Sequence, residues 1–233
     1  MDRIFAIIRR KCLLSVREFT IHPDPLAMGY PLYLTNSFRF DTGVTVLVGC
    51  NGIGKSTLIQ MMKQSLQAEK IPLFAFNNLT EGGSWARSKA GYYQDFDWLA
   101  AATCSSEGEN IIMNMSNCAR EIGRLCRENP EAKEIWLFFD AVDSGLSVDN
   151  IVEIKEDLFH LVLEMNADRD IYIIVSANEY EMARDERCMD VRTGNLITFG
   201  GYDGYRKYIL ESRKLKDTRH KKTKKKKLKE LTT

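Results

Sequence analysis

The stretch Val44-Thr-Val-Leu-Val-Gly-Cys-Asn-Gly-Ile-Gly-Lys-Ser-Thr57 decides the fold of this chain. Its apolar, β-branched first part, Val44–Val48, predicts a buried strand, and a run of helix-forming residues follows its end. Between them, Gly49-x4-Gly54-Lys55-Ser56 has the spacing of a phosphate-binding P-loop. Glycines let the backbone curl until successive N–H groups point at one anion, and the following helix N-terminus adds partial positive charge. The stretch therefore predicts a strand, a phosphate-binding loop and a helix in succession.

A second apolar segment, Ile135-Trp-Leu-Phe-Phe-Asp140, predicts another buried strand, and this one ends in a carboxylate. In a parallel sheet that carboxylate emerges at the edge that also carries the P-loop. There Lys55 would reach the β- and γ-phosphates of a bound nucleotide, the Ser56 hydroxyl would ligate Mg²⁺, and Asp140 would hold the ion through water. We therefore predict the phosphates of a nucleotide and Mg as ligands, with Ser56 and Asp140 at the metal.

Strand and helix patterns alternate over the rest of the chain. Further strands are predicted at residues 3–8, 12–21, 71–76 and 171–175, with a hairpin over 188–199. Helical spacing of apolar residues predicts helices from the P-loop to about residue 70, over 109–128 and 147–165, and from about residue 202 onward. Such alternation predicts an α/β fold with a mostly parallel sheet covered by helices.

Charge divides the chain into two parts, although its 33 Lys and Arg nearly balance its 32 Asp and Glu. Residues 213–233 have a net charge of +9, and residues 1–212 have a net charge of −8. We expect one ATP-binding domain over residues 1–212 and a disordered basic tail over 213–233 that can contact the phosphates of a nucleic acid. Since no apolar run approaches the ~20 residues of a membrane span, we expect a cytoplasmic protein without membrane contact.

The motifs together resemble those of ABC-type ATPases, including their SMC-like soluble relatives. Gly49–Thr57 looks like the GxNGxGKST form of the Walker A loop, and Asp140–Ser147 is similar to the Walker B motif with the D-loop after it. Cys104–Glu109, whose Ser106 lies 34 residues before Asp140, resembles the ABC signature. This resemblance implies an ABC-type P-loop NTPase core, in which an N-terminal β subdomain leans on a mostly parallel sheet flanked by helices.

The resemblance also implies roles for individual residues. Two subunits would stack head to tail as a homodimer, with Ser106 and Gly108 of one binding the γ-phosphate held by the Walker A loop of the other. Lys55, Asp140 and Asp143 would be the catalytic residues. The nucleotide would be bound by Gly49, Asn51, Gly52, Ile53, Gly54, Lys55, Ser56, Thr57, Gln94, Ser106, Gly108 and Asn178.

Three departures from the family pattern bear on hydrolysis and on the biological setting. Ala141 stands where the family has the glutamate that polarises water, which leaves Asp143 as its substitute. Asn178 stands where the family has its switch histidine. Only 51 residues separate Lys55 from Ser106, too few for the helical subdomain of transporter ATPases or for coiled-coil arms.

We therefore expect ATP and Mg binding, ATP-driven dimerisation and slow ATP hydrolysis in a soluble DNA-related, defence or phage system, within a larger protein complex. One alternative is a structural switch that holds ATP without hydrolysing it, which Ala141 favours. A P-loop kinase or GTPase is a second alternative, although the chain has no NKxD guanine motif.

Overall fold

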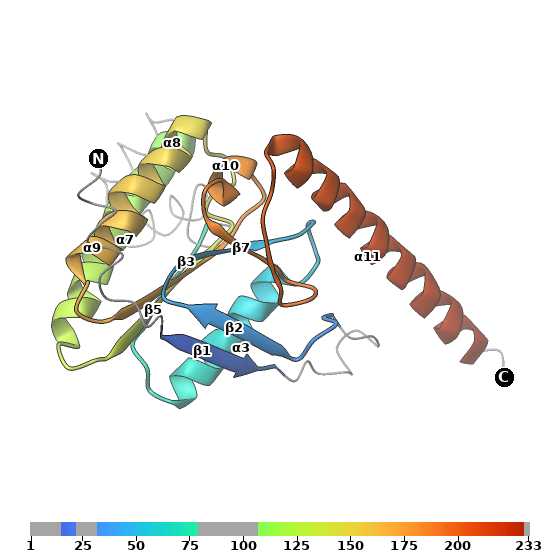
Figure 1. Cartoon of the computed structure of the whole chain (residues 1–233), viewed down its shortest axis with the longest axis horizontal. Helices are drawn as coiled ribbons and strands as arrows, with labels where there is room; N and C mark the ends of the chain where they lie inside the picture. The colour runs from blue at the N-terminus through green and yellow to red at the C-terminus, as the bar shows by residue number, and fades with distance from the viewer. Residues whose placement is uncertain (1–14, 22–31, 79–106, 231–233) are drawn as a thin grey trace, which may run out of the picture.

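The computed structural model describes residues 15–21, 32–78 and 107–230, and these form two β-sheets with helices around the larger one (Figure 1). The smaller sheet is an antiparallel pair, β1 (Val16–Thr20) and β2 (Ser37–Asp41). The strands of the larger sheet lie in the order β4-β5-β6-β3-β7-β8. Their bounds are β3 (Gly43–Val48), β4 (Leu73–Asn77), β5 (Glu134–Asp140), β6 (Asp170–Ser176), β7 (Arg187–Asp190) and β8 (Leu196–Ile197).

The larger sheet is parallel from β4 to β7, and only β8 pairs antiparallel, with β7. The helices of the described chain are α3 (Lys55–Ala68), α7 (Glu107–Glu128), α8 (Val148–Glu153), α9 (Leu161–Met165), α10 (Tyr180–Ala183) and α11 (Tyr202–Glu230). A π-helical stretch, η1 (Ile154–His160), joins α8 to α9 without a break. The predicted α/β class, with a mostly parallel sheet flanked by helices and an N-terminal β unit beside it, is confirmed.

Alternate residues of the buried strands explain why helices lie on both faces of this sheet. In β5, Ile135, Leu137 and Phe139 face a core shared with α7, α8, η1 and α10. Trp136 and Phe138 face the opposite core, which α3 and the β1–β2 pair cover. Because both faces of the strand are buried, β5 is apolar at every position from Ile135 to Phe139 instead of alternating with polar residues.

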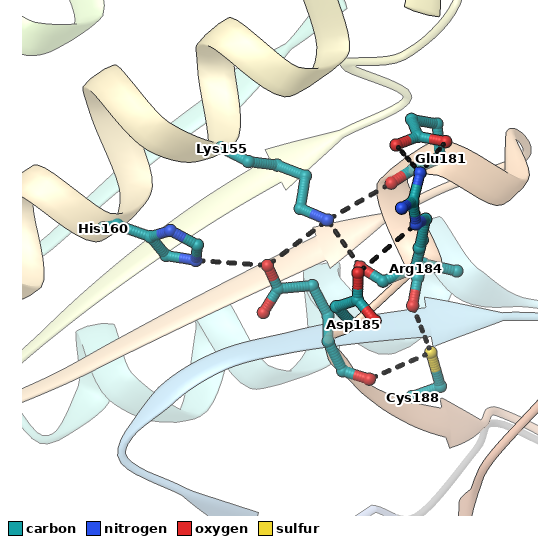
Figure 2. Close-up of polar contacts among 8 residues, drawn as sticks. Lys155, His160, Glu181, Arg184, Asp185 and Cys188 are labelled. Atoms are coloured by element: carbon teal, nitrogen blue, oxygen red, sulfur yellow. Dashed lines mark hydrogen bonds and ion pairs between the residues drawn. The ribbon is translucent and has the colours of Figure 1, made fainter. Parts of the chain in front are cut away.

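A buried lysine fixes the segment between α10 and β7 against the neighbouring helix (Figure 2). Lys155 Nζ, from η1, donates to the backbone oxygens of Glu181 (3.2 Å) and Arg184 (2.5 Å). The same ammonium lies 3.5 Å from Glu186 Oε1, and His160 Nε2 lies 3.2 Å from that oxygen. A buried cation needs such oxygens around it because burial removes its hydration. The cluster is therefore a structural anchor for the segment that leads into β7.

Within the described residues, the predicted elements agree with these bounds. The strand expected at residues 3–8 lies outside the described residues. The final helix, expected from about residue 202, is α11, and it stays helical as far as Glu230, extending away from the body of the molecule (Figure 1). The backbone of the basic segment is helical as far as Glu230, while the domain boundary at residue 212 and the disorder of residues 213–233 remain predictions.

Candidate functional site

The P-loop joins the end of β3 to the start of α3 through backbone conformations that glycine favours. Gly54, the residue before α3, has φ = 115°, and a Cβ there would lie 3.0 Å from Cε1 of Tyr33. Gly49 has φ = 146°, and its Cβ would lie 2.9 Å from Cγ2 of Ile53. Both positions therefore exclude a side chain by conformation and by space. Tyr33 also holds the loop from outside, because its hydroxyl donates to the Gly54 oxygen at 2.8 Å.

Lys55 carries a positive charge into the interior of this loop. Its side chain is buried, and Nζ donates to Gly49 O at 2.7 Å and to Asn178 Oδ1 at 3.0 Å. Burial lowers the pKa of the Lys55 ammonium, because the charged form has lost its hydration. Both hydrogen-bond partners are neutral oxygens, which do not balance the charge of the ammonium. An anion bound at the loop would supply the negative charge.

A carboxylate lies at the same edge of the sheet, where three neighbouring strands end in polar residues. Asn77, Asp140 and Ser176 are at one level across β4, β5 and β6. Asn77 Nδ2 donates to Asp140 Oδ2 at 3.1 Å, and the Ser176 hydroxyl donates to Asp140 Oδ1. Ser56, from the first turn of α3, also donates to Asp140 Oδ1, at 3.0 Å.

The Ser56–Asp140 pair fits the requirements of Mg²⁺. A hydroxyl oxygen and a carboxylate oxygen are hard ligands, and Mg²⁺ is usually held by one or two protein groups while water and phosphates complete its shell. Within the described ranges, no group of three or more His, Cys, Asp or Glu side chains could hold a metal. The residues present therefore suit an ion shared with a phosphate ligand, and Ser56 and Asp140 are the residues that would hold it.

Asp143 lies deeper than the other acidic residue of the site. Its side chain is only 1% exposed, and Oδ2 accepts from the backbone N–H groups of Asn178 at 2.6 Å and Glu179 at 2.7 Å. Burial raises the pKa of Asp143, although these two N–H groups act in the opposite direction. The carboxylate thus fixes the start of the segment after β6 and with it the position of Asn178.

A pH series should detect this buried carboxylate. Because the pKa of Asp143 is higher in the folded than in the unfolded chain, ionising it destabilises the folded state as pH rises above about 4, the usual range of an Asp. Asp143→Asn removes this titration and keeps an oxygen for the two N–H donors. We expect the free energy of unfolding of the parent, minus that of the variant, to fall with rising pH in urea titrations followed by circular dichroism.

Asp157→Asn, at an exposed position of η1, is the matched control, and its difference from the parent should not show this fall. A difference between the parent and Asp143→Asn that stays constant from pH 4 to pH 8 would contradict the raised pKa.

The structure brings most of the predicted site residues to one edge of the sheet. Residues 49–57, Asp140, Asp143 and Asn178 meet there, and Asn51, Gly52, Ser56 and Thr57 are exposed. Gly108 is the second residue of α7. Gln94 and Ser106 lie outside the described residues, so the predicted roles of the Q-loop and the signature stay predictions.

Sequence reasoning missed several residues that support the site. Asn77 and Ser176 hold Asp140, and the signal for them was present, because each is the polar residue that ends an apolar strand. Tyr33 contacts the loop from a segment that no motif marks. Four residues of α11 also contact the loop or its neighbours, and the helical pattern alone does not indicate this.

The family model described as MukB N-terminal matches residues 28–112, less than half of the chain. A comparison with curated proteins gave no match.

Among solved structures, the chain is similar to cbiO1 from Clostridium perfringens, part of the ABC transporter complex cbiONQ. The identity is 16%, the coverage is 79% of this chain and 87% of that one, and the TM-score is 0.44. It is also similar to MJ1267, an ATP-binding cassette of an ABC transporter, at 14% identity, with 88% and 98% coverage and a TM-score of 0.44. None of the described helices is both long and apolar enough to cross a membrane.

Proposed function

We propose that this protein binds ATP with Mg²⁺ at the P-loop and hydrolyses it slowly, as an ABC-type ATPase of an SMC-like kind. One observation carries the proposal: the buried Lys55 ammonium and the Ser56–Asp140 pair lie at the same sheet edge, and Lys55 and Ser56 are the two residues that directly follow the glycine-rich loop. A phosphate chain needs both a cation and a place for Mg²⁺ within reach of backbone N–H groups. The site offers all three.

Each residue then has a separate task. Lys55 would bind the β- and γ-phosphates from its position between Gly49 and Asn178, and the N-terminus of α3 would attract the remaining negative charge. Ser56 and Asp140 would hold Mg²⁺, which when bound neutralises charge on the phosphates. Asn77 and Ser176 keep the Asp140 carboxylate oriented toward Ser56, because both of its oxygens accept hydrogen bonds from them.

Slow turnover follows from the residues after Asp140. Ala141 has no group that can accept a proton from water. Asp143 is buried, and its Oδ2 is already engaged by two backbone N–H groups, which favours an architectural task for it. Positioning and electrostatics supply most of the catalysis in phosphoryl transfer, so hydrolysis without a strong base remains chemically reasonable at a low rate.

The protein is further proposed to dimerise head to tail when ATP is bound, in a soluble DNA-related, defence or phage system. Ser106 and Gly108 would contact the nucleotide of the partner copy. The short span from Lys55 to Ser106 supports a setting other than a transporter, and recovery of the protein together with membrane subunits would argue against it. The basic segment of α11 is proposed to contact nucleic-acid phosphates, with an affinity that falls as salt rises.

Steady-state phosphate release with Mg·ATP tests the proposal, with Lys55→Ala as the blank. We expect release above the blank, with a rate well below 1 s⁻¹, the low end of the roughly 1–1000 s⁻¹ typical of enzymes. If the parent neither binds ATP nor releases phosphate above the blank, the proposal is overturned.

A switch that binds ATP without hydrolysing it is the second candidate, and Ala141 is the observation that favours it. Tight ATP binding and a doubling of mass on a sizing column, without phosphate release above the Lys55→Ala blank, would assign the protein to this class.

A further inference from the structure

One face of helix α11 makes four polar contacts, two with the first half of the P-loop and two with residues beside it, Val48 and Asn178. Tyr205 donates its hydroxyl to Asn178 O at 2.8 Å, and Tyr208 donates to Val48 O at 3.2 Å. The contacts continue along the helix, where the Ser212 hydroxyl accepts from Cys50 N at 3.2 Å and Lys216 Nζ donates to Asn51 O at 2.6 Å. Residues 205, 208, 212 and 216 follow one another at spacings of three and four, so they share a helix face.

A cavity of about 390 Å³ lies between this helix and the loop. Its walls are Gly49, Cys50 and Asn51 of the loop, Asn178, and Ile209, Leu210 and Arg213 of α11. The buried Lys55 is not itself a lining residue, but its Nζ donates to Gly49 O and Asn178 Oδ1, and both of these residues line the cavity. Since a P-loop lysine reaches the β- and γ-phosphates, phosphates bound by Lys55 would lie next to this cavity.

Arg213 is the charged residue that α11 contributes to this cavity. Its side chain is 65% exposed, and its nearest acid is Asp217 on the same helix, with Nε to Oδ2 at 4.0 Å. An exposed ion pair of this length restrains the guanidinium little. The planar fork of an arginine can donate two parallel hydrogen bonds to a phosphate, which makes it suited to an anion entering the cavity.

We propose that Arg213 is a further nucleotide-binding residue, which donates to the terminal phosphate of ATP held by the P-loop of the same chain. This proposal rests on the proposed function and adds to it a preference for a triphosphate over a diphosphate. The cation comes from the final helix, which the four contacts fix against the loop. Arg213 would add positive charge to the cavity, where Asn178 is a neutral lining residue.

Dissociation constants for ATP and for ADP, measured by calorimetry with Mg²⁺ present, test this assignment. Arg213→Gln is expected to weaken ATP binding by about tenfold, the effect of losing a hydrogen bond to a charged group, and to change ADP binding little. Arg213→Lys keeps the charge but loses the fork, so its ATP affinity should lie between those of the parent and Arg213→Gln. Lys214→Gln is the matched control: it removes the same charge from a neighbouring exposed position on α11, away from the cavity lining.

The outcomes separate this proposal from the one on which it rests. Equal losses of ATP and ADP affinity in Arg213→Gln would mean a structural effect through α11 and would overturn the assignment. ATP and ADP affinities that are both unchanged in Arg213→Gln, or the same loss of ATP affinity in Lys214→Gln, would also overturn the assignment. Neither result would contradict the proposal that the P-loop binds ATP. If the parent binds neither nucleotide better than Lys55→Ala does, both proposals fall.

Discussion

Replacing Ala141 with glutamate should raise steady-state phosphate release by about 100-fold or more, because a positioned general base contributes roughly that much to proton transfer. Ala141 follows Asp140 directly at the end of β5, and its N–H donates to the Ser176 hydroxyl at 2.9 Å. Its φ of 54° is left-handed, a conformation that disfavours any residue with a Cβ. Alanine already has a Cβ, so glutamate adds no new kind of backbone strain.

Two variants make this result interpretable. Ala141→Gln has nearly the same size and shape as Ala141→Glu without a carboxylate, so it should stay at the rate of the parent. Adding Lys55→Ala to Ala141→Glu should abolish the gain, because the phosphates would no longer be held. Equal rates in the glutamate and glutamine variants would show that the position cannot serve a base, and would favour the non-hydrolysing switch.

Truncating Trp136 to alanine should lower the free energy of unfolding by about 4 kcal/mol, in the range measured for large buried aromatic residues. Trp136 is fully buried in β5, and its ring stacks on Tyr172 of β6 with centroids 4.1 Å apart and planes 2° apart. Phe19 and Phe40, from β1 and β2, meet it edge to face. The residue therefore joins the small antiparallel sheet to the large one, and its removal weakens both.

Urea unfolding monitored by circular dichroism measures this loss. In a domain of this size, 4 kcal/mol corresponds to a fall of about 10 °C in the melting temperature. Trp136→Phe leaves an aromatic ring in the cluster and should cost less than half as much as Trp136→Ala. A loss below about 1 kcal/mol in Trp136→Ala would mean that the surrounding rings close over the cavity, contrary to the usual behaviour of packed cores.

Several features of the site could be predicted from the sequence because they are local. The P-loop needs glycines at fixed spacings, and Gly49 and Gly54 adopt the backbone that these spacings predict. Asp140 ends an apolar strand, and in a parallel sheet the ends of such strands meet at one edge. The meeting of Ser56 with Asp140 at 3.0 Å follows from these two facts together.

Other features depend on contacts between distant parts of the chain. Tyr33 is 21 residues from Gly54, and Ser212 is 162 residues from Cys50, yet each makes a hydrogen bond there. The spacing of apolar residues within a segment does not indicate which distant segment will pack against it. The burial of Lys155 is a similar case, because a lysine on a helix is mostly exposed and only the oxygens of another segment allow it inside.

The sequence by itself determined the α/β class, the glycine spacing of the P-loop, and the absence of a glutamate at residue 141, because each is a property of neighbouring residues. Only the tertiary structure decided that α11 lies along that loop and that Arg213 borders the cavity beside Lys55. It also decided that Asp143 is occupied by backbone N–H groups. The physical reason is that burial and hydrogen-bond partners arise from the packing of whole elements, and a local pattern does not specify them.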